Sequence, residues 1–313
     1  MEILSQILQV GFFAALVRIA TPLIFGTIGE LYAERAGVLN LGIEGIMMFS
    51  AMAGFSAAYF THSLWLGVLV AVVAGMLGGL LMAVLCVSLG LSQHVSGIGI
   101  TLLFSGLSFF LYRLIFGQPS TIPVIEPFHT VNIPWLAKIP LLGPILFDQY
   151  ALVYLAFLIV PVTAWMLFRT PWGLNLRTVG ENPQAANSAG VSVAATRYQA
   201  LMISGMFMGL GGAFLSMAQY NAFTFGVISG RGWICIALVV FGQWSPYKSM
   251  AGALLFAFID ALQLRLQASH LIQIPYQLFL MMPYVLTILG MALVSRNARA
   301  PAALLLPFRK EER

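Results

Sequence analysis

LWLGVLVAVVAGMLGGLLMAVLCVSLG, residues Leu64–Gly90, decides the fold, because it is long, apolar and free of charged side chains. A helix rises about 1.5 Å per residue, so this stretch can cross the roughly 30 Å of hydrocarbon in a bilayer. Tyr150–Phe168 and Gln273–Val294 are equally free of charge. A buried helix of a globular protein could explain one such stretch, but not several in the same chain.

The composition of the whole chain agrees with a lipid environment. Hydrophobic residues make up 60% of the 313 residues and charged residues 8%, whereas a soluble domain carries about 25% charged residues. We expect an all-α, polytopic membrane protein with about nine transmembrane helices in one domain over residues 1–313. The expected spans lie near residues 8–29, 41–60, 64–90, 94–116, 149–168, 197–220, 226–243, 249–269 and 274–294. The seventh is the weakest, because Gly, Arg and Pro crowd its ends, and a broken or re-entrant helix is the alternative.

The positions of lysine and arginine predict the topology. The segment Arg169–Arg197 carries three arginines and the tail after Val294 is strongly basic, whereas the proline-rich loop Gly117–Asp148 has only Lys138. We therefore expect the first two in the cytoplasm, the loop 117–148 outside, and by parity the N-terminus outside. The net charge of +5 comes from these loops and the tail, without a basic patch interleaved with surface aromatics. Nucleic acid is therefore not an expected partner.

The segment Gly29–Gly45, GELYAERAGVLNLGIEG, places ionisable residues beside or within apolar spans. Such residues usually line an aqueous path or pair with one another. Glu30, Glu34 and Arg35 fit that interpretation and, equally well, an ordinary cytoplasmic turn in water. For Asn40 and Glu44, which lead into an apolar span, an internal structural or pathway role is favoured.

The segment Arg177–Gly190, RTVGENPQAANSAG, predicts a short capped helix in the cytoplasm. Asn182 suits the N-cap, Pro183 the first helical position and Gly190 the C′ position. A helix of about two turns is too short to span a membrane. It either connects two spans or, because its Ala185, Ala186 and Ala189 are small, lets another protein approach closely.

Several enzymatic motifs are missing from the sequence. None of the three lysines follows a glycine, so there is no Walker A loop. HExxH and GxSxG are also absent. The two cysteines, Cys86 and Cys235, lie in apolar stretches and are read as small buried side chains, and the four histidines are scattered. We expect no catalytic site, no metal and no cofactor.

With these segments in view, the chain resembles the permease subunits of ABC importers for simple sugars, nucleosides and branched-chain amino acids. It is most similar to the nucleoside and simple-sugar branch. The resemblance rests on five segments that follow the family's order over nearly the full chain: ERAGVLNLGIEGIMM (Glu34–Met48), GLNLRTVGENPQAANSAGVSV (Gly173–Val193), SGMFMGLGGAF (Ser204–Phe214), GRGWICIALVVFGQWSPYK (Gly230–Lys248) and MMPYVLTIL (Met281–Leu289). One departure is Gln243, where relatives more often have glycine.

The resemblance implies a type II importer fold in the bacterial inner membrane, with the C-terminus in the cytoplasm. Its implied partners are cytoplasmic ATP-binding subunits, a second and often non-identical permease, and an external solute-binding protein. Segment 173–196 would couple the permease to the ATPase through Gly180, Glu181, Asn182, Pro183, Ala185, Ala186 and Gly190. Substrate, a nucleoside or a simple sugar, would pass at the subunit interface near Asn40, Glu44, Gly97, Gly99 and Thr101. An ion- or proton-coupled carrier working alone is the alternative function.

Overall fold

The computed structural model describes residues 10–118, 121–132, 139, 142–269, 281, 285, 288, 292 and 299–308. Within them, the long helices are α2 (Val10–Arg35), α3 (Ile43–Thr61), α4 (Leu64–Ala83) with the π-helical turn η1 (Val84–Ser88), α5 (Gln93–Phe116), α7 (Ala151–Arg169), α10 (Val193–Ala213) with the π-helical end η2 (Phe214–Gln219), and α12 (Pro246–Ser269). The short elements are β1 (Thr130–Asn132), α6 (Leu142–Leu146), β2 (Asp148–Tyr150), α8 (Pro171–Glu181), α9 (Pro183–Ser188) and α11 (Arg231–Phe241).

Seven helices of the described part of the chain are long and apolar enough to cross a membrane. They coincide with seven of the predicted spans, which confirms the all-α polytopic fold. The seventh predicted span, 226–243, is broken: residues 221–230 are not helical, and α11 has only 11 residues. The predicted ninth span, 274–294, lies outside the described residues, apart from a few isolated positions.

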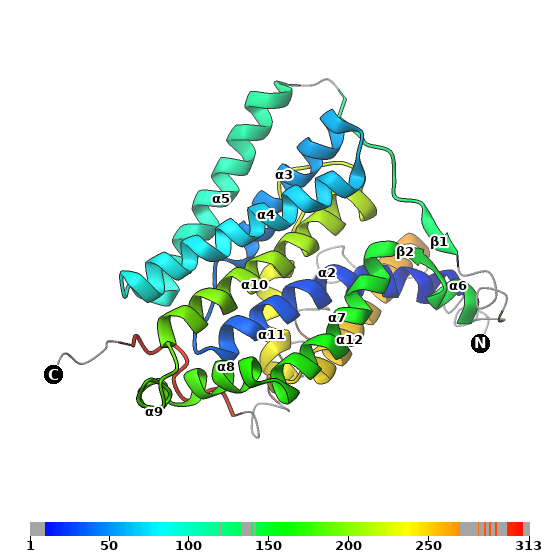
Figure 1. The fold of residues 1–313 in the computed structure, drawn as a ribbon. Helices are drawn as coiled ribbons and strands as arrows, with labels where there is room; N and C mark the ends of the chain where they lie inside the picture. The colour runs from blue at the N-terminus through cyan, green and yellow to red at the C-terminus, as the bar shows by residue number, and fades with distance from the viewer. Residues whose placement is uncertain are drawn as a thin grey trace.

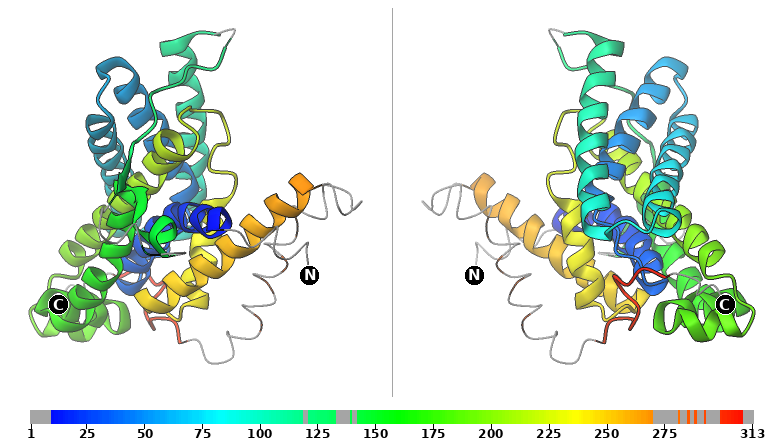
Figure 2. Two further views of the ribbon diagram at one scale, coloured as in Figure 1. Left: turned by 90° about the vertical axis from the view of Figure 1, so that its right-hand side faces the viewer. Right: turned by 90° about the vertical axis from the view of Figure 1, so that its left-hand side faces the viewer.

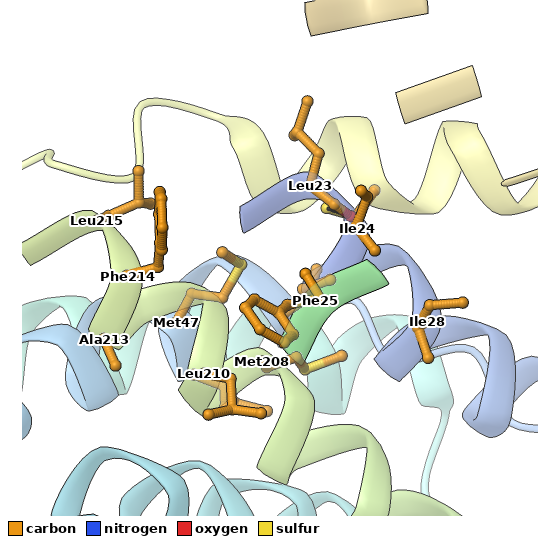
Figure 3. Close-up of a cluster of buried hydrophobic side chains, with 14 of the residues drawn as sticks. Leu23, Ile24, Phe25, Ile28, Met47, Met208, Leu210, Ala213, Phe214 and Leu215 are labelled. Atoms are coloured by element: carbon orange, nitrogen blue, oxygen red, sulfur yellow. Dashed lines mark hydrogen bonds between the residues drawn. The ribbon is translucent and has the colours of Figure 1, made fainter. Parts of the chain in front are cut away.

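Helices α2 and α10 form the centre of the bundle. Figure 1 shows α3, α4 and α5 on one side of this pair and α7, α11 and α12 on the other, and the packing of the elements agrees. Figure 2 shows that α12 inclines away from the α4–α5 side. In Figure 3, Phe25 of α2, Met47 of α3 and Met208 of α10 meet in the buried core. Close packing of this kind drives helix association in lipid, where the hydrophobic effect between helices is weak.

Helices α4 and α10 cross with almost no space between their backbones. A Cβ atom on Gly75 would collide with the carbonyl oxygen of Gly205, and one on Gly79 would collide with the carbonyl oxygen of Leu201. Small residues at this spacing allow the closest approach of two helices in a membrane. These glycines therefore serve helix packing.

Described parts of the loop 117–148 pair with other segments of the chain. Strand β1 pairs antiparallel with β2, with Thr130 opposite Tyr150. Earlier in the loop, Val124 pairs with Ala222, which follows η2. The first pairing connects the described part of the loop to the start of α7, and the second connects it to the segment that follows α10 and η2.

Candidate functional site

The loop 36–42 between α2 and α3 is non-helical and largely buried. Backbone groups in such a place need hydrogen-bond partners, because water cannot supply them. Side chains from other segments do so: Glu30 Oε1 accepts from the backbone N–H of Asn40 at 2.9 Å, and Gln93 Oε1 accepts from that of Leu39 at 2.8 Å. Thr101 Oγ1 donates to the carbonyl of Leu41 at 2.9 Å. The loop is thus fixed against both α2 and α5.

The glutamates at the end of α2 lie inside the protein. Glu30 is 0% exposed and Glu34 1%, so the interpretation as a turn in water is wrong for both. Glu34 Oε2 accepts from the indole Nε1 of Trp244 at 2.6 Å. Arg35 donates from Nε and Nη2 to the carbonyl of the same tryptophan, at 3.1 and 2.8 Å. Together the two side chains attach the end of α2 to the turn that follows α11.

Glu44, in the first turn of α3, caps the broken seventh segment. Its two carboxylate oxygens accept from the backbone N–H groups of Gly230 and Gly232, each at 2.8 Å. These N–H groups belong to the start of α11, where the helix dipole favours a negative charge. A Cβ on Gly232 would lie 2.8 Å from both the Cα and the backbone nitrogen of Glu44, so glycine is required for this approach. Glu44 is half-buried, and its carboxylate holds the start of α11 in place.

The predicted short helix is present as α9, with the predicted caps. Asn182 is the N-cap, and its Oδ1 accepts from the backbone N–H of Ala185 at 2.9 Å. At the other end Gly190 has a φ of 86°, its N–H donates to Asn187 O, and the N–H of Val191 donates to Ala186 O. This pair of bonds is a Schellman motif, which ends a helix firmly.

The residues expected to couple to an ATPase fall into two groups. Glu181, Asn182, Ala185 and Gly190 are exposed, whereas Gly180, Pro183 and Ala186 are buried. Ala186 packs against Val179 and Val193 and does not share an open face with Ala185 and Ala189.

The buried residues fasten the short helices to the bundle. A Cβ on Gly180 would collide with the carbonyl oxygen of Arg35. The end of α8 is thereby held directly against the end of α2, and α9 follows from it.

The expected pathway residues gather around the loop 36–42, and most of them face inward. Asn40 is 0% exposed, Gly97 is buried with its Cβ position 2.6 Å from the Cβ of Leu41, and Thr101 holds the loop. Gly99 differs, because it is exposed and no described atom lies within 4 Å of its Cβ position. Of the five candidates, only Gly99 is exposed on the surface of the described residues.

Two residues of this arrangement were missed by sequence reasoning. Gln93 was outside every predicted motif, and Arg197 was read as the basic end of a cytoplasmic loop. Arg197 is 1% exposed, and its Nε donates to the carbonyl of Ala36 at 3.1 Å. An isolated arginine at the entrance of an apolar span was the available signal, since such residues usually have a specific partner.

Comparison with known proteins now identifies the family. Residues 12–294 match the family described as branched-chain amino acid transport system, permease component. The chain is 39% identical to the guanosine ABC transporter permease protein NupQ of Bacillus subtilis, over 98% of this chain and 99% of the relative. It is 37% identical to the nucleoside ABC transporter permease protein NupC of Lactococcus lactis, over 91% and 92%. It is 43% identical to the putative glucose ABC transporter permease protein TsgC13 of Haloferax volcanii, over 83% and 79%.

A solved structure shares the fold. It is an inward-facing conformation of a putative metal-chelate type ABC transporter, with a TM-score of 0.52, 17% sequence identity, and coverage of 88% of this chain and 85% of that chain. At this identity the match shows a shared fold only, and the family assignment follows from the sequence matches. This chain is a multi-pass membrane protein that belongs to the family of permease components of branched-chain amino acid transport systems.

Proposed function

We propose that the chain is the membrane-spanning permease subunit of an ATP-driven importer for nucleosides or simple sugars. The full-length similarity to guanosine, nucleoside and glucose ABC transporter permeases supports this function. The structural observation that supports this function best is the firmly capped helix α9. Its exposed side consists of Glu181, Asn182, Ala185 and Gly190. We propose that this surface receives a cytoplasmic ATP-binding subunit.

A series of contacts leads from α9 into the bundle. Gly180 lies directly against the carbonyl of Arg35, and Arg197 donates to Ala36, so movement of α8 and α9 acts on the start of the loop 36–42. That loop continues into α3, where Glu44 holds α11. Interfaces packed this closely change by shifts of whole elements. ATP-driven movement of the coupling segment would therefore reposition α2, α3 and α11 together.

The outer face of α5 is the proposed surface for substrate passage. Gly99 and Gly106 are exposed there and lack described neighbours at their Cβ positions. A second permease, non-identical to this one, would cover this face and form the pathway with it. Asn40, Glu44, Gly97 and Thr101 would then act from behind, by fixing the backbone that supports the pathway wall.

The proposal also gives the orientation of the chain in the membrane. Residues 1–313 form one permease domain in the cytoplasmic membrane, with the C-terminus and segment 173–196 inside. The loop 117–148 lies outside, where a solute-binding protein delivers substrate.

The test is a single substitution on the exposed side of α9. Ala185→Arg places a long charged side chain on the proposed ATPase surface, and we expect loss of ATPase co-purification and of ATP-dependent uptake. Thr61→Arg is the matched control, because Thr61 is exposed at the C-terminal end of α3 and is not part of the proposed ATPase surface. Ala186→Arg is unsuitable, since Ala186 is 4% exposed and its replacement would disturb folding. Unchanged ATPase binding and uptake by Ala185→Arg would overturn the coupling assignment, and uptake without any ATPase would favour the carrier.

A further inference from the structure

The described segment near the C-terminus, residues 301–308, is docked against the coupling segment; we call it the C-terminal strap. The backbone N–H of Ala303 donates to the carbonyl of Gly180 at 2.9 Å, and that of Ala302 to Glu181 Oε2 at 3.3 Å. Ala303 is 3% exposed. The strap is drawn in red beside α8 and α9 in Figure 1. Its attachment points are two of the residues already proposed for ATPase coupling.

A buried arginine fixes the strap from the other side. Arg197 donates from Nη1 to the carbonyl of Leu306 at 3.4 Å, while its Nε holds the carbonyl of Ala36. Phe308 packs against the small apolar cluster that contains Val179 and Ala186. One guanidinium therefore connects the strap to the loop 36–42, and one cluster connects it to α9.

A groove of about 370 Å³ lies between the coupling segment and the strap. Residues 181–184 line one side, and Ala302, Ala303, Leu306 and Pro307 line the other. The groove is apolar along the strap, with the carboxylate of Glu181 at its edge. A cavity of this size accommodates one or two side chains of a partner protein.

The strap presents two leucine side chains, because its anchoring at Leu306 uses only the backbone carbonyl. Leu306 is 57% exposed and Leu305 is 39% exposed. Leu305 has a φ of 69°, a left-handed conformation that is costly for a residue with a side chain and is kept when the surroundings hold it. The anchors at Ala303 and Leu306 supply this restraint. The leucines are thus displayed in a fixed geometry and not on a loose tail.

We infer that the C-terminal strap and the coupling segment form one composite docking surface, in which the groove receives an apolar side chain of the ATP-binding subunit flanked by a lysine or arginine. The ATPase is the fitting occupant because the groove is continuous with the exposed side of α9, and Glu181 and Asn182 belong to both. An incoming basic group would complement the carboxylate of Glu181. This inference rests on the proposed function and adds a second ATPase contact to the coupling helix.

The first experiment measures the affinity of the purified ATPase subunit for the permease in nanodiscs. Leu306→Asp replaces the exposed leucine in the groove by a charge, and we expect affinity to fall about tenfold. Leu89→Asp is the control, since Leu89 is 61% exposed in the turn before α5 and does not line the groove. The control is expected to bind like the wild type.

The second experiment does not depend on the folding of the charged variant. The sequence has only two cysteines, Cys86 and Cys235, and both are buried, so Leu306→Cys introduces an exposed thiol. A short thiol–amine cross-linker should join it to the ATPase subunit in the assembled complex. The matching Leu89→Cys variant is the control, and we expect no cross-link from its thiol to the ATPase.

The outcomes separate the inference from the proposed function. If Ala185→Arg abolishes ATPase binding while Leu306→Asp binds normally and Leu306→Cys gives no cross-link, the inference fails and the proposed function stands. If a fluorophore attached to the thiol at position 306 is instead quenched by a lipid-bound quencher in the complex, the strap lies on the bilayer and the inference fails. If the wild type binds no ATPase at all, the proposed function itself fails.

Discussion

Replacing Glu44 removes the group that holds the start of α11. In the structure its carboxylate accepts from two backbone N–H groups, those of Gly230 and Gly232, both at 2.8 Å. Both donors lie at a helix N-terminus, where no intrahelical partner exists for them. Glu44→Ala therefore leaves two partly buried N–H groups without an acceptor.

The expected loss in the free energy of unfolding follows from the number of hydrogen bonds that the substitution removes. An unsatisfied buried donor costs about 1–3 kcal/mol, so we expect Glu44→Ala to lower the free energy of unfolding by about 2–6 kcal/mol. Glu44→Gln keeps one acceptor oxygen and presents an amide NH₂ to the second N–H. We therefore expect Glu44→Gln to lose about half as much as Glu44→Ala.

The assay is thermal unfolding of the purified protein in detergent, followed by tryptophan fluorescence. Trp233 and Trp244 lie on α11 and just after it, so they report on this region. Glu126→Ala removes a carboxylate from an exposed position in the loop 117–148 and is the control. If Glu44→Ala unfolds at the same temperature as Glu126→Ala and the wild type, the carboxylate does not hold α11 and the reasoning is refuted.

Three further predictions follow from close contacts and caps. Gly205→Leu should lower the free energy of unfolding by about 1–3 kcal/mol, because any Cβ there meets the backbone of α4. Gly99→Leu should leave thermal unfolding unchanged and reduce uptake, because no described atom lies near its Cβ position. Gly232→Ala should reproduce the loss of stability of Glu44→Ala in the same assay, since its Cβ would lie 2.8 Å from the Cα and backbone nitrogen of Glu44, and wild-type stability would contradict this. Asn182→Ala should cost about 1 kcal/mol of local stability, which hydrogen exchange of the α9 amides measures, and unchanged protection would count against the cap.

Features that depend on neighbouring residues were predictable from the sequence. The caps of α9 are an example, because Asn182 and Gly190 act on backbone groups within three or four positions of themselves. Most spans were also predictable, since hydrophobic length is a local property. The weak point recognised at span 226–243 corresponds to the non-helical residues 221–230 and the short α11.

Features that depend on distant contacts were only partly predictable. The apolar surroundings of Glu44 indicated an internal role, but its partners lie 186 and 188 positions away in the sequence. The spacing of Ala185 and Ala186 could not say which of them faces inward, because that depends on Val179 and Val193. No local pattern in the sequence predicted that Arg197 joins the loop 36–42 to the strap.

The most direct test of the central claim is uptake by proteoliposomes that contain the complete transporter. This chain would be co-expressed with the neighbouring permease, ATPase and solute-binding protein genes, and uptake of a radiolabelled nucleoside would be measured with ATP or a non-hydrolysable analogue. We predict that uptake requires ATP hydrolysis and that Ala185→Arg abolishes it while Thr61→Arg does not. Uptake by this chain alone, driven by an ion or proton gradient without ATP, would contradict the account.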